Sequence, residues 1–452
     1  MRFNRFATVA AFAFASTIAF GFFTTIPAQA QIKPGQIKPG DIITSDNASK
    51  AEGLLSPGNF ILVKHGMAMN IVPTGHLYWP PPYKAATEQY SPQVSLSADG
   101  ELQNYVAGLP FPLVDANDPN AATKIMWNFA FRPLNTDDLD ARDVEAVSHR
   151  QGSSAELEHF TFGHLGSYKY VGRTEVAPTP MDPDVLKTGI VARAGAYPIL
   201  EPAEMRGAGI VSQRYAIPGF EDAVWEYSSA SRMLRRLPAV ELSDSFGVSK
   251  SGGGSMASPN AGVTTYASTW DPDSAFGFSP RIQDYSYRLL GERSMLASVE
   301  AANSPAKPCA NDGGRSVCTE NWEMRHLYVI EATPKPRSPV GGSTIIPKRV
   351  LYIDSEGWFI TASDQFDERG QLAKTLVTFH AYRDRPIANA RVAIWPFKRI
   401  FQTAMVDEDL SDGFSTVVYS PGHESHEDGV YINMGTVDRT FFTPEKMVQA
   451  GH

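Results

Sequence analysis

Lys348 to Tyr382 read KRVLYIDSEGWFITASDQFDERGQLAKTLVTFHAY, three apolar stretches separated by two short polar ones. Each polar stretch ends in a glycine, Gly357 in DSEG and Gly370 in DERG. Glycine at the end of such a short polar stretch is typical of hairpin turns. The segment therefore predicts three antiparallel strands joined by two hairpins.

Segments of the same character follow one another from about residue 160 to the end of the chain. They include HFTFGHLGSYKYVGR, GAGIVSQRY, AVWEY, MLRRL, YSYRLLGER, MRHLYVIEATPK and VYINMGTVDRTFF. Helical patterns are few and mostly early in the chain. We therefore expect an α+β protein, mainly antiparallel β, with one large curved sheet packed over a few helices.

The clearest helical pattern is DPNAATKIMWNFAFRP, from Asp118 to Pro133. We expect Asp118 to cap the helix and Pro119 to occupy its first position. The apolar positions that fall on one face are Ala122, Ile125, Met126 and Phe129. Trp127 lies outside this face, so we expect the helix to be sandwiched or to lie against a cavity. A second segment, YWPPPYK at residues 78–84, predicts polyproline II structure.

The N-terminus has the composition of a secretion signal. Arg2 and Arg5 precede a run without acidic residues from Phe6 to Phe23, and Ala28-Gln29-Ala30 is a small-x-small cleavage pattern. We expect residues 1–30 to be a signal peptide cleaved after Ala30; a membrane anchor is the alternative interpretation. No later segment has the roughly 20 apolar residues of a spanning helix, so we expect a soluble, exported mature chain.

Charge and cysteine content narrow the function. Without the two signal arginines, 38 basic residues face 49 acidic ones, for a net charge of −11, which argues against a nucleic-acid partner. Cys309 and Cys318 lie in CANDGGRSVC, and in an oxidising compartment we expect them to form a disulfide that closes this glycine-rich loop. A metal pair is the weaker interpretation, because no histidine lies nearby.

The sequence contains no Gly-x-Ser-x-Gly, HExxH or phosphate-binding loop motif. We therefore expect no cofactor, no metal and no catalytic residue. The polar segment GHESHEDG, residues 422–429, is bounded by glycines and predicts a solvated acidic loop more than a metal site. An exported hydrolase remains an alternative. Its conceivable polar residues are Glu331, Asp364 and His380, although no spacing argues for them.

The segment VWEYSSASRMLRRLP, residues 224–238, predicts two short paired strands. Its apolar residues and arginines fit two interpretations equally, because the wall of a cavity and a closed core share one pattern. In the first interpretation the arginines meet carboxylate or phosphate head groups, and in the second they form ordinary surface pairs.

Five ordered blocks carry a resemblance to a known family. They are YVAGLPFPLVDANDPNAATKIMWN (residues 105–128), ILEPAEMRGAGIVSQRY, VWEYSSASRMLRRLP, NWEMRHLYVIEATPK and KRVLYIDSEGWFITASDQFDERGQLAK. The chain resembles the Gram-negative family called domain of unknown function 1329 from about residue 40 to 445. Members of that family are often labelled outer-membrane lipoprotein-sorting proteins.

The resemblance implies a fold similar to the periplasmic lipoprotein carrier, an unclosed β-barrel that leaves an apolar cavity for acyl chains. It implies one domain over residues 31–445, with a helical or extended part (31–135), a β-rich part (136–445) and a tail (446–452). The protein would be a periplasmic carrier of a lipid, lipoprotein acyl chains or another hydrophobic molecule. A non-catalytic partner of an outer-membrane protein or resistance-nodulation-division exporter is the alternative.

The resemblance also favours the cavity interpretation of residues 224–238. The expected hydrophobic wall consists of Trp127, Trp225, Tyr227, Met233 and Leu237. Arg235 and Arg236 would contact the head group of the ligand.

Overall fold

The structure is a computed structural model that describes residues 37–216, 222–237, 276–279, 281–336, 346–388, 390–423 and 429–451. The expected signal peptide and residues 424–428 of the GHESHEDG segment lie outside these ranges. No helix in the described ranges is long and apolar enough to cross a membrane.

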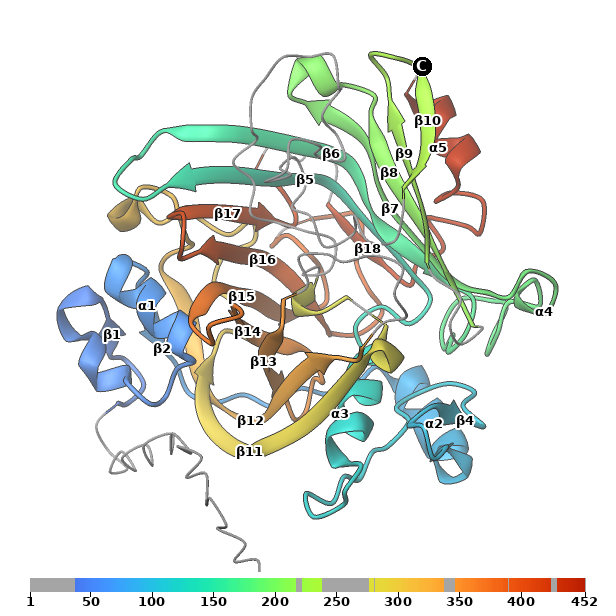
Figure 1. The fold of residues 1–452 in the computed structure, drawn as a ribbon, viewed down its shortest axis with the longest axis horizontal. Helices are drawn as coiled ribbons and strands as arrows, with labels where there is room; N and C mark the ends of the chain where they lie inside the picture. The colour runs from blue at the N-terminus through green and yellow to red at the C-terminus, as the bar shows by residue number, and fades with distance from the viewer. Residues whose placement is uncertain are drawn as a thin grey trace, which may run out of the picture.

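One sixteen-stranded, mostly antiparallel sheet dominates the molecule, and its order is β1-β2-β12-β13-β14-β15-β16-β17-β5-β6-β7-β8-β9-β10, with β11 beside β12 and β18 beside β5. Its strands are β1 Ile42–Ile43, β2 Met69–Ile71, β5 Asp138–Arg150, β6 Glu156–Lys169, β7 Ile190–Glu201, β8 Gly209–Tyr215, β9 Ala223–Ser228, β10 Met233–Leu237, β11 Tyr285–Ala297, β12 Glu320–Pro334, β13 Lys348–Asp354, β14 Ile360–Phe366, β15 Leu372–Arg383, β16 Arg399–Asp409, β17 Phe414–Tyr419 and β18 Val430–Ile432. The sheet curves from β11 and β12 to β5 and β6 without closing (Figure 1). The expected large, curved and unclosed antiparallel sheet is therefore confirmed.

The two expected hairpins form the centre of this sheet. β13 pairs with β14 and β14 pairs with β15, all antiparallel. In the second turn Gly370 has φ +74°, which a residue with a side chain rarely adopts. The stretch from Lys348 to Tyr382 therefore folds as its pattern predicts.

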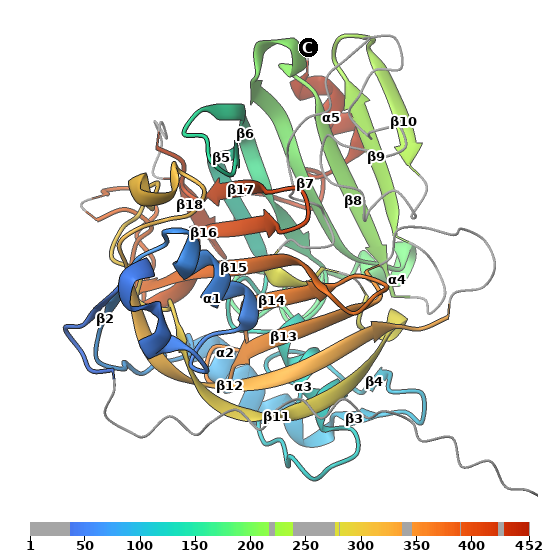
Figure 2. The same ribbon diagram turned by 60° about the vertical axis from the view of Figure 1, so that its left-hand side comes forward.

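The helices lie on both faces of the sheet rather than only inside it. They are α1 Pro57–His65, α2 Pro81–Tyr90, α3 Ala121–Ala130, α4 Val185–Thr188 and α5 Pro444–Ala450, while β3 Ser95–Leu96 and β4 Leu102–Gln103 form a separate small hairpin. α3 packs on the concave face, α1 packs on the opposite face of β14–β17, and α5 covers the outer face of β7–β9 (Figure 2).

Three local expectations need correction. The expected tail begins inside α5, since residues 446–450 belong to this helix and its Met447 is fully buried against Tyr227 and Phe442. The segment 78–84 enters α2 at Pro81 instead of staying extended, since the first turn of a helix needs no backbone donors and tolerates proline. α3 begins at Ala121, with Asn120 rather than Asp118 as its cap residue.

Candidate functional site

An apolar hollow lies on the concave face where β5, β6, β16, β17 and β18 meet. Its cavity volume is about 50 Å³, within about 610 Å³ of empty space that includes open solvent. The lining residues are Leu134, Asn135, Leu139, Ala141, Val144, Leu165, Phe276, Phe401, Gln402, Met405, Val418, Ser420, Val430 and Ile432. Only three of them are polar, so the wall of the hollow is almost entirely apolar.

Strand alternation and register build this wall from segments far apart in the chain. Val430 on β18 pairs with Ala141 on β5, and Ala141 pairs with Leu165 on β6. Cross-strand partners point to the same face, so these three side chains form one apolar row. Asp143, with φ +49°, marks the place where β5 exchanges its neighbour β18 for β17. Beyond it Val144 faces the hollow again.

Two basic side chains lie beside the hollow. Arg132 follows α3, and its guanidinium lies 5.4 Å from the ring centre of Phe276, which lines the hollow. Lys169 ends β6 on the same face as Leu165, because residues two and four apart in a strand share a face. Between them Ser167 accepts a hydrogen bond from Asn135, another lining residue, at 3.3 Å. Arg132 and Lys169 therefore approach one end of the hollow.

Neither base meets a carboxylate among the described residues. Arg132 donates from Nη1 to the carbonyl of Phe129 at 2.9 Å, while its buried Nε has no hydrogen-bond partner there. Burial lowers the pKa of Arg132 to about 10. Burial, with the nearby charge of Arg132, lowers the pKa of Lys169 to about 7. Arg132 is thus buried and Lys169 half-buried, and neither forms an ion pair with a carboxylate in the described chain.

The nearest acid is already engaged elsewhere. The charge of Asp137 acts on Lys169 in the opposite direction and raises its pKa. However, the carboxylate of Asp137 accepts hydrogen bonds from the backbone N–H groups of Thr174, Glu175 and Val176 at 2.5–2.7 Å. These bonds tie Asp137, which directly precedes β5, to the backbone of the loop after β6.

His380 is a third base with an unsatisfied atom on this face. It pairs across the strands with Gln402, a lining residue, and its ring lies 3.9 Å from that of Phe359. Its buried Nδ1 has no hydrogen-bond partner in the described chain. Burial, and then the charge of Arg132, lower the pKa of His380 to about 3, so the ring is neutral at pH 7.

The predicted wall residues of β9 and β10 do not line this hollow. The two strands pair as expected, but Trp225 and Tyr227 point to the outer face, where they pack under α5. Met233 and Leu237 pair with Ser228 and Val224, so they point to the other face, and Met233 is 60% exposed. The hairpin is real, but its four apolar side chains are divided between two faces.

The two arginines predicted to hold a head group are also separated. Arg235 faces the concave side, but its Nε donates to the Glu226 carboxylate at 2.6 Å. Arg236 lies on the outer face with its guanidinium 5.8 Å from the Trp225 ring centre. These contacts match the ordinary surface pairs of the alternative interpretation.

Trp127 lies on the concave side but away from the hollow. It packs with the other aromatic residues of α3, and its Nε1 donates to the carbonyl of Gly100 at 2.9 Å. Its helix fills the adjacent part of the concave face, between β12–β14 and the N-terminal loops. Trp127 therefore belongs to a packed core.

Cys309 and Cys318 form the expected disulfide. No group of three or more histidine, cysteine or acidic residues in the described ranges is arranged to hold a metal ion. From the GHESHEDG segment, His423 is described, and its Nδ1 lies 2.8 Å from a Glu145 oxygen.

The three residues of the hydrolase alternative do not converge. Glu331 and Asp364 both pair with Val350, on the face opposite to His380. Glu331 accepts a hydrogen bond from Arg288 at 2.9 Å. Asp364 is buried and accepts bonds from Ser56, Gly58 and Thr375, and burial raises its pKa to about 6.

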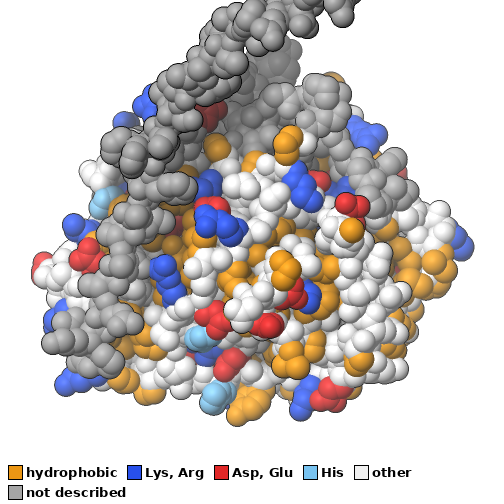
Figure 3. Space-filling model, turned by 60° about the horizontal axis from the view of Figure 1, so that its bottom comes forward, with side chains coloured by type: hydrophobic (Ala, Val, Ile, Leu, Met, Phe, Trp, Pro, Cys, Tyr) orange, Lys and Arg blue, Asp and Glu red, His pale blue; other side chains and the backbone are white. Residues whose placement is uncertain are grey.

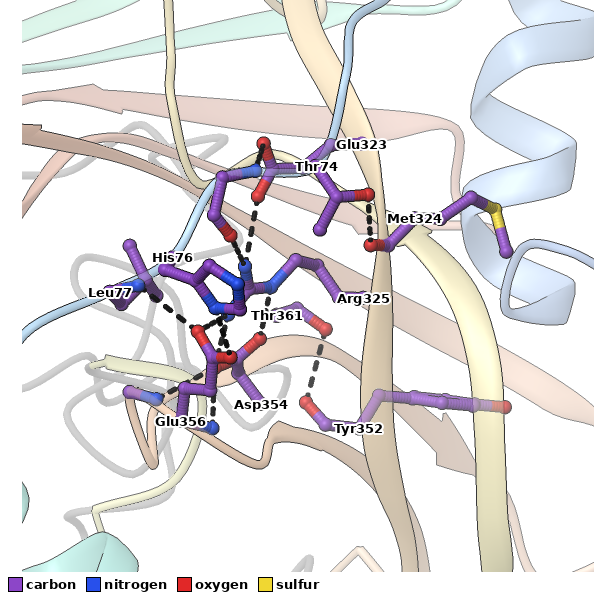
Figure 4. A network of polar contacts seen from close by, with 12 residues as sticks. Thr74, His76, Leu77, Glu323, Met324, Arg325, Tyr352, Asp354, Glu356 and Thr361 are labelled. Carbon is purple, nitrogen blue, oxygen red and sulfur yellow. Dashed lines mark hydrogen bonds and ion pairs between the residues drawn. The ribbon is translucent and has the colours of Figure 1, made fainter. Parts of the chain in front are cut away.

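A buried polar network is centred on Arg325 (Figure 4). This buried guanidinium meets the carboxylates of Asp354, Glu323 and Glu356 at 2.8–3.2 Å and also donates to the carbonyl of Gly75. Glu356 in turn accepts from the backbone N–H of Leu77 at 3.0 Å. The network joins the segment before α2 to β12 and β13, which is a structural role.

Figure 3 shows how charged side chains are distributed on one face of the molecule. There, basic and acidic side chains are interspersed among apolar and neutral ones.

A family model described as "Protein of unknown function (DUF1329)" matches residues 42–447. The chain belongs to this family. The resemblance inferred from the five sequence blocks is thereby confirmed, over nearly the span expected from them. A comparison with curated proteins finds none that matches.

Solved structures similar to this member of the family have low identity to it. A domain named as an outer membrane lipoprotein-sorting protein from Vibrio parahaemolyticus has 15% identity and a TM-score of 0.44, covering 74% of this chain and 100% of that chain. A DUF1329 family protein from Desulfovibrio piger has 16% identity and a TM-score of 0.41, covering 69% and 92%. A LolA superfamily protein from Nitrosomonas europaea has 14% identity and a TM-score of 0.31, covering 68% and 90%.

Proposed function

We propose that the protein is a periplasmic carrier that holds the hydrocarbon part of a lipid, an acylated protein or another hydrophobic molecule in the hollow on its concave face. The observation that carries this proposal is the apolar lining contributed by five strands and Phe276. The expected signal peptide supports the periplasmic location.

Simple transfer energetics would drive loading. Each methylene withdrawn from water contributes about 0.8 kcal/mol, so a long chain gains several kcal/mol even after the loss of its own freedom. No energy source is needed in the carrier, because a receptor with higher affinity would set the direction of transfer.

Filling the hollow tests the proposal. Ala141 is a small, buried lining residue on β5, and Ala141→Phe places a ring in the hollow. We expect this variant to lose at least tenfold in affinity for hexadecanol, a neutral sixteen-carbon chain, in a dye-displacement titration. Leu113→Phe, at a surface position, is the control and should bind as the unmodified protein does.

Val418→Phe, at a second lining position, repeats the test if Ala141→Phe loses its native circular dichroism. Equal hexadecanol affinity in the unmodified protein and in a folded plug variant would refute the hollow as the binding site.

A further inference from the structure

Two basic residues lie at one end of the hollow, next to its apolar walls. Its walls are apolar, yet Arg132 and Lys169 approach it without a carboxylate partner among the described residues. A buried charge is costly unless it is paired, and proteins rarely leave two cations close together in that state. Binding of an anion would therefore stabilise the two basic residues.

We propose that Arg132 and Lys169 bind the anionic head group, a carboxylate or a phosphate, of the amphiphile whose hydrocarbon chain occupies the hollow. This inference rests on the proposed carrier function and adds the chemical class of the ligand. An apolar chain ending in one negative charge complements both parts of the site. Arginine suits this role because its planar guanidinium can bind both oxygens of a carboxylate or phosphate.

The position of the two bases supports a single ligand that spans both parts. Arg132 contacts Phe276, and Lys169 extends the face of β6 that carries Leu165. Phe276 and Leu165 both line the hollow, so a head group between the bases would continue directly into the apolar space. Stacking on Phe129, at 4.4 Å, also holds the Arg132 guanidinium in place before a ligand binds.

The lowered pKa values of Arg132 and Lys169 favour the binding of an anion. The pKa of Lys169 is lowered to about 7 by burial and by Arg132, so the free protein holds this amine only partly charged. A bound anion would favour the charged form and offset the repulsion between the two bases. Arg235 provides a contrast on the same face, because Glu226 already occupies its guanidinium.

Matched ligands measure the role of the head group apart from the chain. Hexadecanoate, hexadecyl phosphate and hexadecanol share one sixteen-carbon chain, and each can displace the neutral dye N-phenyl-1-naphthylamine from the purified protein. We expect at least one anionic ligand to bind tenfold or more tightly than hexadecanol, with the better of the two identifying the head group. Equal affinity for all three would overturn the inference while leaving the carrier function intact.

Variants assign the preference to the two bases. Arg132→Gln and Lys169→Gln should each reduce the preference for the anion by about fivefold to tenfold and leave hexadecanol binding within twofold. Arg235→Gln, the matched control, should change neither value. A preference that persists in the Arg132→Gln/Lys169→Gln double variant would refute the assignment. If Arg132→Gln does not fold, Lys169→Glu should invert the preference, and an unchanged preference would count against the proposal.

Short anions and the plug variant separate the remaining possibilities. Acetate and inorganic phosphate, without a chain, should not displace the dye at millimolar concentration; displacement at the affinity of hexadecyl phosphate would show an independent anion site and overturn the inference. If no chain-bearing ligand binds and Ala141→Phe changes nothing, the carrier function itself fails.

Discussion

Arg132 and Arg325 are buried to a similar degree, with 8% and 4% of their surfaces exposed, yet their surroundings are opposite. Arg325 meets three carboxylates, and their hydrogen bonds and charges raise its pKa although burial alone would lower it. Arg132 meets no carboxylate in the described chain, and burial lowers its pKa. The ion pairs of Arg325 stabilise the fold. Arg132 forms no ion pair in the described chain, so its guanidinium can bind an anionic ligand.

The largest expected effect comes from removing each arginine in turn. Arg325→Met leaves Asp354 and Glu323 buried without their cation, so we expect it to lower the free energy of unfolding by about 3–5 kcal/mol. Arg132→Met removes a buried charge that leaves no acid behind, so we expect a change within about 1 kcal/mol. Urea denaturation monitored by circular dichroism gives both values.

These two free energies test the contrast between Arg325 and Arg132 directly. Equal losses in the two variants would mean that Arg132 also has a structural counter-charge. Binding of hexadecanoate provides the complementary measurement, since Arg325→Met should leave the preference for an anion unchanged if enough folded protein remains.

A smaller effect concerns the acid within the Arg325 network. Burial raises the pKa of Glu323 to about 7, so the folded protein holds this proton more tightly than the unfolded chain, whose pKa is near 4.5. The bound proton of Glu323 therefore stabilises the folded protein at low pH, and this stabilisation is lost as the pH rises through 7. Between pH 5 and 8 the unmodified protein should lose about 2 kcal/mol relative to Glu323→Gln. Parallel pH profiles of the two proteins would contradict this assignment.

The smallest effect belongs to His423, which forms an ion pair with Glu145 and remains partly exposed. A hydrogen bond from His423 to Glu145 raises the pKa of the imidazole above 6.5. The raised value means that stabilisation is full below pH 6.5 and declines as the pH rises through the folded-state pKa. His423→Gln should cost at most about 1 kcal/mol at pH 6 and less at pH 8. A loss that grows with pH, in thermal melts at both values, would exclude this pair as its source.

Local sequence patterns predicted many of the strands, because alternation and turn chemistry are properties of neighbouring residues, but they missed β5, β7, β16 and β17. The hairpins around Gly357 and Gly370 and the apolar face of α3 follow from such patterns. The pairing of Val224–Ser228 with Met233–Leu237 follows similarly. Local patterns did not predict which face of the sheet each side chain of this pair takes. The register places Trp225 and Tyr227 under a helix more than 200 residues later in the chain.

The site residues were missed for the same reason. Arg132 and Lys169 carry no motif, and what distinguishes them is that neither forms an ion pair with a carboxylate in the described fold. Burial without a partner is a property of the assembled structure. A possible signal was the proximity of Arg132 to α3, since the aromatic residues of that helix already indicated that it was buried on more than one side.

The sequence by itself determined many of the strands, the central hairpins, the cysteine pair and membership in the family, but not the strands β5, β16 and β17 that line the hollow. The features that it determined depend on short-range geometry or on blocks that can be read in order. The tertiary structure decided which face each strand turns to the hollow. It also decided which acidic and basic side chains form ion pairs in the described chain. Those outcomes depend on pairing between residues such as Ala141 and Val430, and only the register of the assembled sheet brings such residues together.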